Sequence, residues 1–270
     1  MMRPIKSCGS LLRRIRSGPR ATVDAGSLGL QDAVLSGWFQ NETRELFEGF
    51  TIDPTDTVLD VGCGDGGHAC FCARVGARLI LVDANSAKVA TAKARVSAQA
   101  RQPVDAIVSD ANPLPLDNAT VTKVISTEVL EHVDDPHQFL NELVRVGKPG
   151  ARYLLTVPDP VAEEIQTHLA PAAAFQKPNH IRIIQRDDFA RLVSGAGLVV
   201  EKRAFYGFFW AMHLTLLWPS GADYDSPRHP VLDGWCETWQ ALLSLPRGKQ
   251  VQQLLNAVMP KSQIIIARKP

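Results

Sequence analysis

The fold of this chain is decided by the segment from Val58 to Gly67, which reads VLDVGCGDGG. An apolar, strand-like run leads into Gly62, Gly64 and Gly67, which match the pattern G-x-G-x-x-G. Glycine has no Cβ, so this turn can take positive φ and let a ligand lie against bare backbone. The segment therefore predicts a strand, a glycine turn and a helix at the binding site of a nucleoside cofactor.

Apolar runs alternate with helical patterns along the chain from about Thr57 to Val157. The expected strands are Thr57 to Gly62, Arg78 to Asp83, Val104 to Ser109, Thr122 to Thr127 and Tyr153 to Val157. The expected helices are Gly67 to Val75, Ser86 to Ala100 and Pro136 to Val146, the last one capped by Asp134 or Asp135. This alternation predicts βα units, and hence an α/β fold with a doubly wound, Rossmann-like sheet covered by helices on both faces.

The C-terminal part of the chain has a different pattern. Prolines interrupt residues 158–186, where we expect a substrate loop, and a helix follows from Asp187 to Ala196. Two more strands are expected at Leu198 to Phe205 and Gln263 to Arg268. Between them, residues 207–262 form a tryptophan-rich helical insertion. Its apolar part, residues 205–218, is too short to cross a bilayer, so it is either buried in its own domain or faces a partner, a lid or lipid.

The N-terminal part of the chain is basic. We expect residues 1–29 to form a tail that is either mobile or rests on an anionic membrane surface as an amphipathic segment. A helix is expected from Leu30 to Phe47, capping the open edge of the cofactor site. Residues 30–270 then form one domain around a cofactor-binding core at 48–157.

The composition limits the partners and the compartment. A formal net charge of +1 gives no overall field that would attract nucleic acid. The five cysteines match neither a disulfide framework nor a zinc pattern. We therefore expect reduced thiols and a cytoplasmic protein, with peripheral contact at the inner membrane surface as an open alternative.

Asp83 supports a nucleoside cofactor of either class, and three further features narrow that class. Asp83 follows Gly64 by nineteen positions, where a carboxylate can accept hydrogen bonds from a ribose. Asp60 precedes the turn, Ser109-Asp110-Ala111 follows the third strand, and Ser126-Thr127-Glu128-Val129-Leu130-Glu131-His132 follows the fourth. With these motifs the chain resembles the class I S-adenosylmethionine-dependent methyltransferases, among them small-molecule, sugar and quinone O-methyltransferases, from about Val58 to Val157.

The resemblance implies a seven-stranded sheet whose last strand is antiparallel, with S-adenosylmethionine as the donor and S-adenosylhomocysteine as the product. Its implied cofactor contacts form one set along the carboxyl ends of the strands. Asp60 and the turn residues Gly62, Cys63 and Gly64 would face the methionine end, Asp83 the ribose, Ala84 the adenine, Asp110 and Ala111 the adenine edge, and Thr127 the methionine side.

Two histidines are candidates for the acceptor end of the site. His132 lies just past the fourth strand, and an imidazole that titrates near neutrality suits proton removal from a hydroxyl; it is equally open as a structural residue of its turn. His180 lies in the segment expected to cover the substrate. Asp134 and Asp135 are explained by helix capping, so no metal is predicted.

The sequence thus predicts O-methylation of a small-molecule hydroxyl, either on a sugar of a glycoconjugate or natural product or on an isoprenoid-linked phenol. An Asn-Pro-Pro-Tyr type motif is absent, which disfavours a nucleic-acid base or a protein amide as the acceptor. Two alternatives stay open at this point: an NAD(P)-dependent Rossmann oxidoreductase and a non-catalytic member that only binds the cofactor. The oligomeric state is not predicted.

Overall fold

The structure is a computed structural model that describes residues 24–224 and 227–270. Its centre is a seven-stranded sheet in the order β6-β5-β4-β7-β8-β10-β9, and β10 runs antiparallel to both of its neighbours. The strands are β4 (Thr57–Val61), β5 (Arg78–Asp83), β6 (Val104–Val108), β7 (Val121–Thr127), β8 (Gly147–Pro158), β9 (Val199–Tyr206) and β10 (Ser262–Arg268). The predicted fold class is confirmed, including the reversed last strand.

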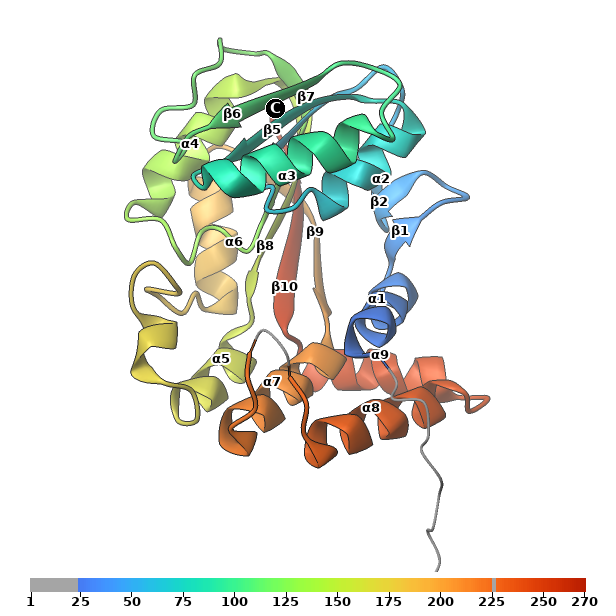
Figure 1. Cartoon of the computed structure of the whole chain (residues 1–270). Helices are drawn as coiled ribbons and strands as arrows, with labels where there is room; N and C mark the ends of the chain where they lie inside the picture. Colours follow the sequence, from blue (N-terminus) through green and yellow to red (C-terminus); the bar gives the residue numbers. More distant parts are fainter. Residues whose placement is uncertain (1–23, 225–226) are drawn as a thin grey trace, which may run out of the picture.

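Helices cover both faces of this sheet (Figure 1). On one face α4 (Pro136–Val146) and α6 (Arg186–Gly195) bury Phe139, Leu143 and Phe189 against the strands. On the other face α2 (Gly67–Val75) and α3 (Ser86–Ser97) pack their small residues on the sheet. Asp135 is the cap of α4, because its carboxylate accepts from the N–H groups of His137 and Gln138.

The predicted helix from Leu30 to Phe47 is wrong. Helix α1 spans Ala25–Leu35 and is followed by a small antiparallel sheet of β1 (Trp38–Gln40), β2 (Glu45–Phe47) and β3 (Phe50–Thr51). Gly37, with φ at +106°, ends the helical path, and Trp38 and Phe47 pair across strands and pack on the sheet's α2 face. Aromatic residues at loosely helical spacing therefore form a hairpin here.

Helix α1 begins at Ala25, inside the range expected for the basic tail, and Asp24 caps it. Residues 1–23, with the open question of a membrane-bound segment, lie outside the described residues. In the two described stretches, no helix is both long enough and apolar enough to span a bilayer.

The insertion before the last strand consists of α7 (Phe208–Ser220), α8 (Pro230–Leu243) and α9 (Gly248–Val258). With α1 these helices gather at one end of the molecule, below β9 and β10 in Figure 1. Phe209 and Trp239 are fully buried in a cluster with Leu28 of α1, so the apolar segment 205–218 packs largely within its own domain. The expected substrate loop contains α5 (Pro160–Thr167) and the short 3₁₀ helix η1 (Ala172–Phe175).

Candidate functional site

A cleft of about 480 Å³ lies at the carboxyl ends of β4 to β7. Seven predicted site residues line it: Gly62, Gly64, Asp83, Ala84, Asp110, Ala111 and His132. The other four, Asp60, Cys63, Thr127 and His180, lie beside or behind its wall. Parallel strands end at the same edge of a sheet, which is why residues so far apart in the sequence meet here.

The glycine turn is built for close approach. Gly62, Gly64 and Gly66 take positive φ, whereas Gly67, the third glycine of the predicted pattern, begins α2. A Cβ on Gly62 would lie 2.2 Å from Val129 Cγ2, so no side chain fits there. A Cβ on Gly64 would meet nothing within 4 Å, which leaves its backbone bare toward the cleft.

Four N–H groups of this turn are already used inside the protein, those of Gly62, Cys63, Gly64 and Gly66. Those of Gly62 and Cys63 donate to the carbonyl of Val82 at 2.8 and 3.0 Å, and that of Gly64 donates to Asp83 Oδ2 at 3.0 Å. A pyrophosphate needs free N–H donors at such a turn. With these donors used and the Asp60 and Asp83 carboxylates close to it, the turn suits a cationic ligand better than a dinucleotide.

Asp60 adds a buried carboxyl group to the site. Its side chain is 1% exposed and both of its carboxylate oxygens lack a hydrogen-bond partner among the described residues. Burial, together with the nearby Asp83 carboxylate, raises the pKa of Asp60 to about 7. An orphaned buried carboxylate beneath an open glycine turn fits a cofactor that carries an ammonium and a sulfonium group.

Local hydrogen bonds fix the loop at the predicted adenine end. The N–H of Ala111, expected to face the adenine, donates to Ser109 Oγ at 3.0 Å. Asp110 Oδ1 accepts from the N–H of Asn112 at 3.0 Å, so a two-residue turn fixes this carboxylate at the cleft. Ala111 has φ at +61°, a strained value for alanine that holds the loop against the cleft wall.

Thr127 and Cys63 stand behind the cleft. Thr127 Oγ1 lies 3.4 Å from Nδ1 of His68, whose ring stacks on Trp38 at 4.8 Å between centroids. Burial lowers the pKa of His68 to about 4, so this imidazole is neutral. Cys63 is buried, and burial with the nearby carboxylates raises its thiol pKa to about 12, so it contributes backbone only.

The structure brings His132 and His180 together around Glu131. The two rings lie 4.9 Å apart between centroids, and their Nε2 atoms lie 3.8 and 4.0 Å from Glu131 Oε1. Glu131 is fully buried and its carboxylate has no hydrogen bond among the described residues. Burial, with Glu128 nearby, raises the pKa of Glu131 well above its usual value.

His132 has a defined tautomer in this arrangement. Its Nδ1 lies 3.2 Å from the carbonyl oxygen of Pro178, which can only accept, so Nδ1 carries the proton and Nε2 is the basic atom. Burial lowers its pKa, so the ring is neutral at pH 7. His180 is bound through Nδ1 to Glu163 of α5 and stands behind His132, outside the cleft.

Glu131, His132 and His180 place one ligand atom each within 4.8 Å of one another, a donor set of the kind that divalent metals accept. The sequence analysis predicted no metal, and that stays a prediction.

Sequence reasoning missed an ion pair between Glu128 and Lys261. Glu128 lines the cleft and has φ at +56°, and its carboxylate binds Lys261 and Thr156 Oγ1. Burial opposes the charge on Glu128, but the Lys261 ammonium outweighs it and lowers the pKa of the carboxyl. Glu128 is part of the sequence motif from Ser126 to His132. Lys261 lies 133 residues further along the chain, and no sequence motif around it indicates that it pairs with Glu128.

Known proteins share the central part of the chain. A family model described as "Methyltransferase domain" matches residues 59–155. Ubiquinone biosynthesis O-methyltransferase of Maricaulis maris is 40% identical over 125 residues, 46% of this chain and 46% of that protein. Norajmaline N-methyltransferase of Rauvolfia serpentina is 29% identical over 197 residues, 70% of this chain and 62% of that protein.

A probable tocopherol O-methyltransferase of Oryza sativa is 30% identical over 240 residues, 79% of this chain and 60% of that protein. The chain thus spans 46 to 62% of the length of these three relatives.

Solved structures agree on the fold. A putative methyltransferase from Bacillus halodurans has a TM-score of 0.55 at 18% identity, covering 92% of this chain and 99% of that one. Geranyl diphosphate C-methyltransferase from Streptomyces coelicolor has a TM-score of 0.51 at 17% identity, covering 91% and 77%. With the motif set, the sheet order and the domain match in agreement, the chain belongs to the class I S-adenosylmethionine-dependent methyltransferases.

Proposed function

We propose that the protein transfers a methyl group from S-adenosylmethionine to a hydroxyl of a small molecule, a sugar or a phenol. The observation that carries this proposal is His132: it lines the cofactor cleft, its Nδ1 is held by a carbonyl, and its Nε2 is free of a proton. Removing a proton is needed for a hydroxyl acceptor, so a neutral imidazole at this place favours oxygen.

We assign the residues of the cleft to the cofactor as follows. Asp60 and the carbonyl groups of the turn at Gly62 and Gly64 hold the ammonium of the methionine end, with Thr127 closing that side. Asp83 accepts from the ribose hydroxyls, since each carboxylate oxygen keeps a lone pair beyond its backbone hydrogen bond. Asp110 accepts from the adenine amino group, and Ala84 packs beside the ring.

The chemical step is an in-line displacement. The donor supplies an electrophilic methyl carbon, which bonds to the acceptor oxygen as the carbon–sulfur bond breaks and its electron pair stays on sulfur. His132 Nε2 takes the hydroxyl proton, and the Pro178 carbonyl holds the ring in the required tautomer. Alignment of the acceptor opposite the methyl, away from water, supplies much of the rate enhancement.

The first experiment tests the cofactor. Purified protein is heated with S-adenosylhomocysteine, NAD or NADP, and the melting temperature is recorded, since a ligand that binds the native state stabilises it. Protection by S-adenosylhomocysteine alone is expected. Protection by a nicotinamide cofactor instead would favour an oxidoreductase.

The second experiment tests His132. Release of S-adenosylhomocysteine is measured with a panel of phenols and sugars, for the wild type and His132→Ala. We expect a loss in turnover of about 10² to 10⁴-fold, the range for a missing general base, with cofactor affinity nearly unchanged. Unchanged turnover would remove His132 from the mechanism, and no turnover with any acceptor pool would favour a non-catalytic member.

A further inference from the structure

A second cavity, of about 510 Å³, lies between α1 and α7. Its size falls within the usual range for small-molecule sites. The side chains around it are mostly apolar: Leu30, Ala33, Trp210, Leu214, Leu217 and Tyr224. An open space with such a lining favours a ligand with an apolar body, because burying that body against these side chains removes it from water.

The inner end of this cavity meets the cofactor cleft at the Glu128–Lys261 ion pair. Lys261 lines the cavity, Glu128 lines the cleft, and the two side chains bind each other. Their side chains are 28% and 25% exposed, so both can still be reached by a ligand. The pair therefore stands where a molecule in the cavity would approach a methyl donor in the cleft.

The chemistry of the pair selects the polar group of that molecule. Lys261 has three N–H donors, of which one binds Glu128 and another lies 3.3 Å from Ser262 Oγ. The third can donate to an acceptor oxygen. Glu128 already neutralises the ammonium of Lys261. A phosphate or carboxylate group of the ligand would therefore be repelled by the Glu128 carboxylate, whereas a neutral hydroxyl group would not.

An ammonium beside the acceptor oxygen also favours one kind of hydroxyl. Glu128 offsets the net charge of this ammonium, so the ammonium gives the acceptor oxygen a hydrogen bond but little stabilisation of a full negative charge. The hydroxyl itself must therefore be acidic enough to give its proton to an imidazole. A phenol, with a pKa of about 10, is acidic enough to benefit with imidazole as the base, whereas alcohol hydroxyls are far less acidic.

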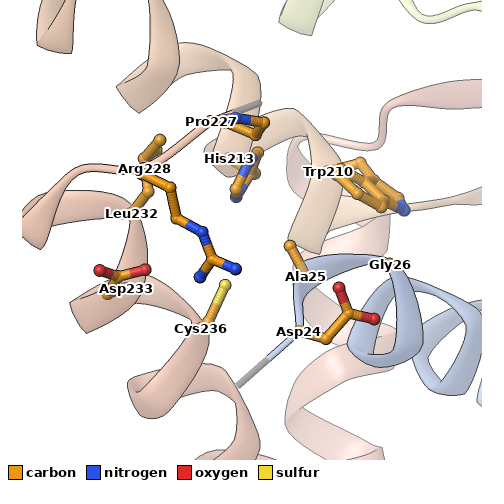
Figure 2. A pocket seen from close by; sticks show the side chains of 10 residues that line it. All are labelled: Asp24, Ala25, Gly26, Trp210, His213, Pro227, Arg228, Leu232, Asp233 and Cys236. Carbon is orange, nitrogen blue, oxygen red and sulfur yellow. The ribbon is translucent and has the colours of Figure 1, made fainter. Parts of the chain in front are cut away.

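A second space of about 290 Å³ adjoins this cavity, between α1, α7 and α8 (Figure 2). Trp210, His213 and Pro227 line both spaces. His213 is 3% exposed, and burial lowers its pKa, so no charge stands at the junction. Figure 2 shows Arg228 extending into the far space, with Asp24 and Asp233 on opposite sides of it. The combined shape has room for an extended side chain.

We propose that the cavity between α1 and α7 is the acceptor site, and that the acceptor is a phenol with an extended apolar side chain whose hydroxyl oxygen binds Lys261. This inference rests on the proposed methyl transfer and leaves its chemical step unchanged. It assigns the insertion helices a function, which is to bind the acceptor.

Binding is measured by calorimetry on the full-length protein, without turnover, using 2-farnesylphenol, phenol and farnesyl phosphate as probes. We expect 2-farnesylphenol to bind at least 100-fold more tightly than phenol and at least 10-fold more tightly than farnesyl phosphate. Equal binding of phenol and 2-farnesylphenol would overturn the apolar site, and tighter binding of farnesyl phosphate would overturn the neutral hydroxyl.

The Ala33→Phe substitution fills the cavity from the side of α1, and we expect it to weaken the binding of 2-farnesylphenol at least 10-fold. Val34→Phe is the matched control, because Val34 is 40% exposed and lies outside the cavity. We expect this variant to bind 2-farnesylphenol with wild-type affinity. Leu214→Trp fills the cavity from α7 and replaces Ala33→Phe if that variant does not fold. Wild-type affinity in the folded cavity-filling variant overturns the proposal.

S-adenosylhomocysteine binding is measured on the same samples. If it binds and 2-farnesylphenol does not, the inference fails and the proposed function stands. If S-adenosylhomocysteine does not bind, the proposed function fails, whatever the probes do.

Discussion

The cofactor half of the molecule and the insertion half build their sites in opposite ways. In the cofactor half, from β4 to β7, the important groups lie at strand ends and in turns. Most of their hydrogen bonds join residues that are fairly close in the sequence, such as Gly64 and Asp83, which are 19 residues apart. In the insertion half, contacts join residues far apart in the chain: Gln252 binds Asp32, 220 residues away. Local motifs therefore reveal the cleft at the ends of β4 to β7, but they give no sign of the cavity between α1 and α7.

The largest effect should come from Asp83→Ala, because it removes a local contact on which the whole cofactor half depends. The carboxylate holds the N–H groups of Gly64 and Asn85 at 3.0 and 2.9 Å and is the proposed partner of the ribose. Hydrogen bonds to charged groups contribute about 1.5 to 3 kcal/mol each, so S-adenosylhomocysteine affinity should fall by about 100-fold or more.

Calorimetry measures this loss, and thermal unfolding without ligand serves as the control for folding. If the Asp83→Ala variant folds and keeps wild-type affinity for S-adenosylhomocysteine, the cofactor half does not rely on the carboxylate of its sequence motif, and the proposed difference between the two halves is wrong.

Lys261→Met tests the contact that joins the two halves. It leaves Glu128 without its ammonium in a place only 25% exposed, and we expect the free energy of unfolding to fall by about 1 to 3 kcal/mol. The double variant Lys261→Met with Glu128→Gln should recover much of this loss, because no uncompensated charge remains. Urea denaturation measures both. Equal stability of wild type and single variant would mean that the pair contributes nothing.

The pH dependence of this pair has a defined sign. The pKa of Lys261 is raised, with burial opposing and the Glu128 charge prevailing, so its contribution is present below 10.5 and is lost as the pH rises further. The pKa of Glu128 is lowered, so its contribution is present above 4.5 and is lost as the pH falls. The difference between wild type and double variant should be flat from pH 6 to 9.

The difference between the cofactor half and the insertion half also explains which elements of the fold can be predicted from the sequence. Strands β4, β5 and β7 are largely buried and read as mostly apolar runs, so their positions are visible in the sequence. The edge strand β6 is partly exposed, and its position is visible from its β-branched valines and isoleucine. Asp83 and Asp110 follow such runs, and their place at the cleft follows from strand direction. The hairpin at Trp38 to Phe47 was missed because its apolar spacing suits a helix, and only the geometry at Gly37 and the packing on α2 decide against one.

The insertion was predicted as helical, but its role could not be. Its first helix, α7, is apolar nearly all round because it packs against α1 and α8, and sequence periodicity does not identify those partners. Lys261 lies in a short loop before β10 and carries no motif. Its importance arises only when the fold sets it against Glu128.

Asp32→Asn probes the insertion half with a smaller effect. Asp32 is 1% exposed, and burial raises its pKa to about 6 although Gln252 donates to it. A raised carboxyl pKa favours folding below 3.8 and loses that contribution as the pH rises through about 6. The variant should be more stable than wild type by about 1 kcal/mol at pH 8, and less so toward pH 4.5. A less stable variant at pH 8, by urea denaturation, would contradict this account.

Asp65→Asn should have the smallest effect, although Asp65 lies inside the glycine turn. Its carboxylate is 71% exposed and pairs with Arg95 at 2.6 Å, itself 48% exposed. Exposed pairs contribute about 0 to 1 kcal/mol, so stability should change by less than about 0.5 kcal/mol and S-adenosylhomocysteine affinity by less than about twofold. In this turn Gly62 and Gly64 line the cleft, whereas the Asp65 side chain is exposed to solvent. A tenfold loss of affinity on Asp65→Asn, with unfolding unchanged, would show that the turn acts through its side chains as well as its backbone.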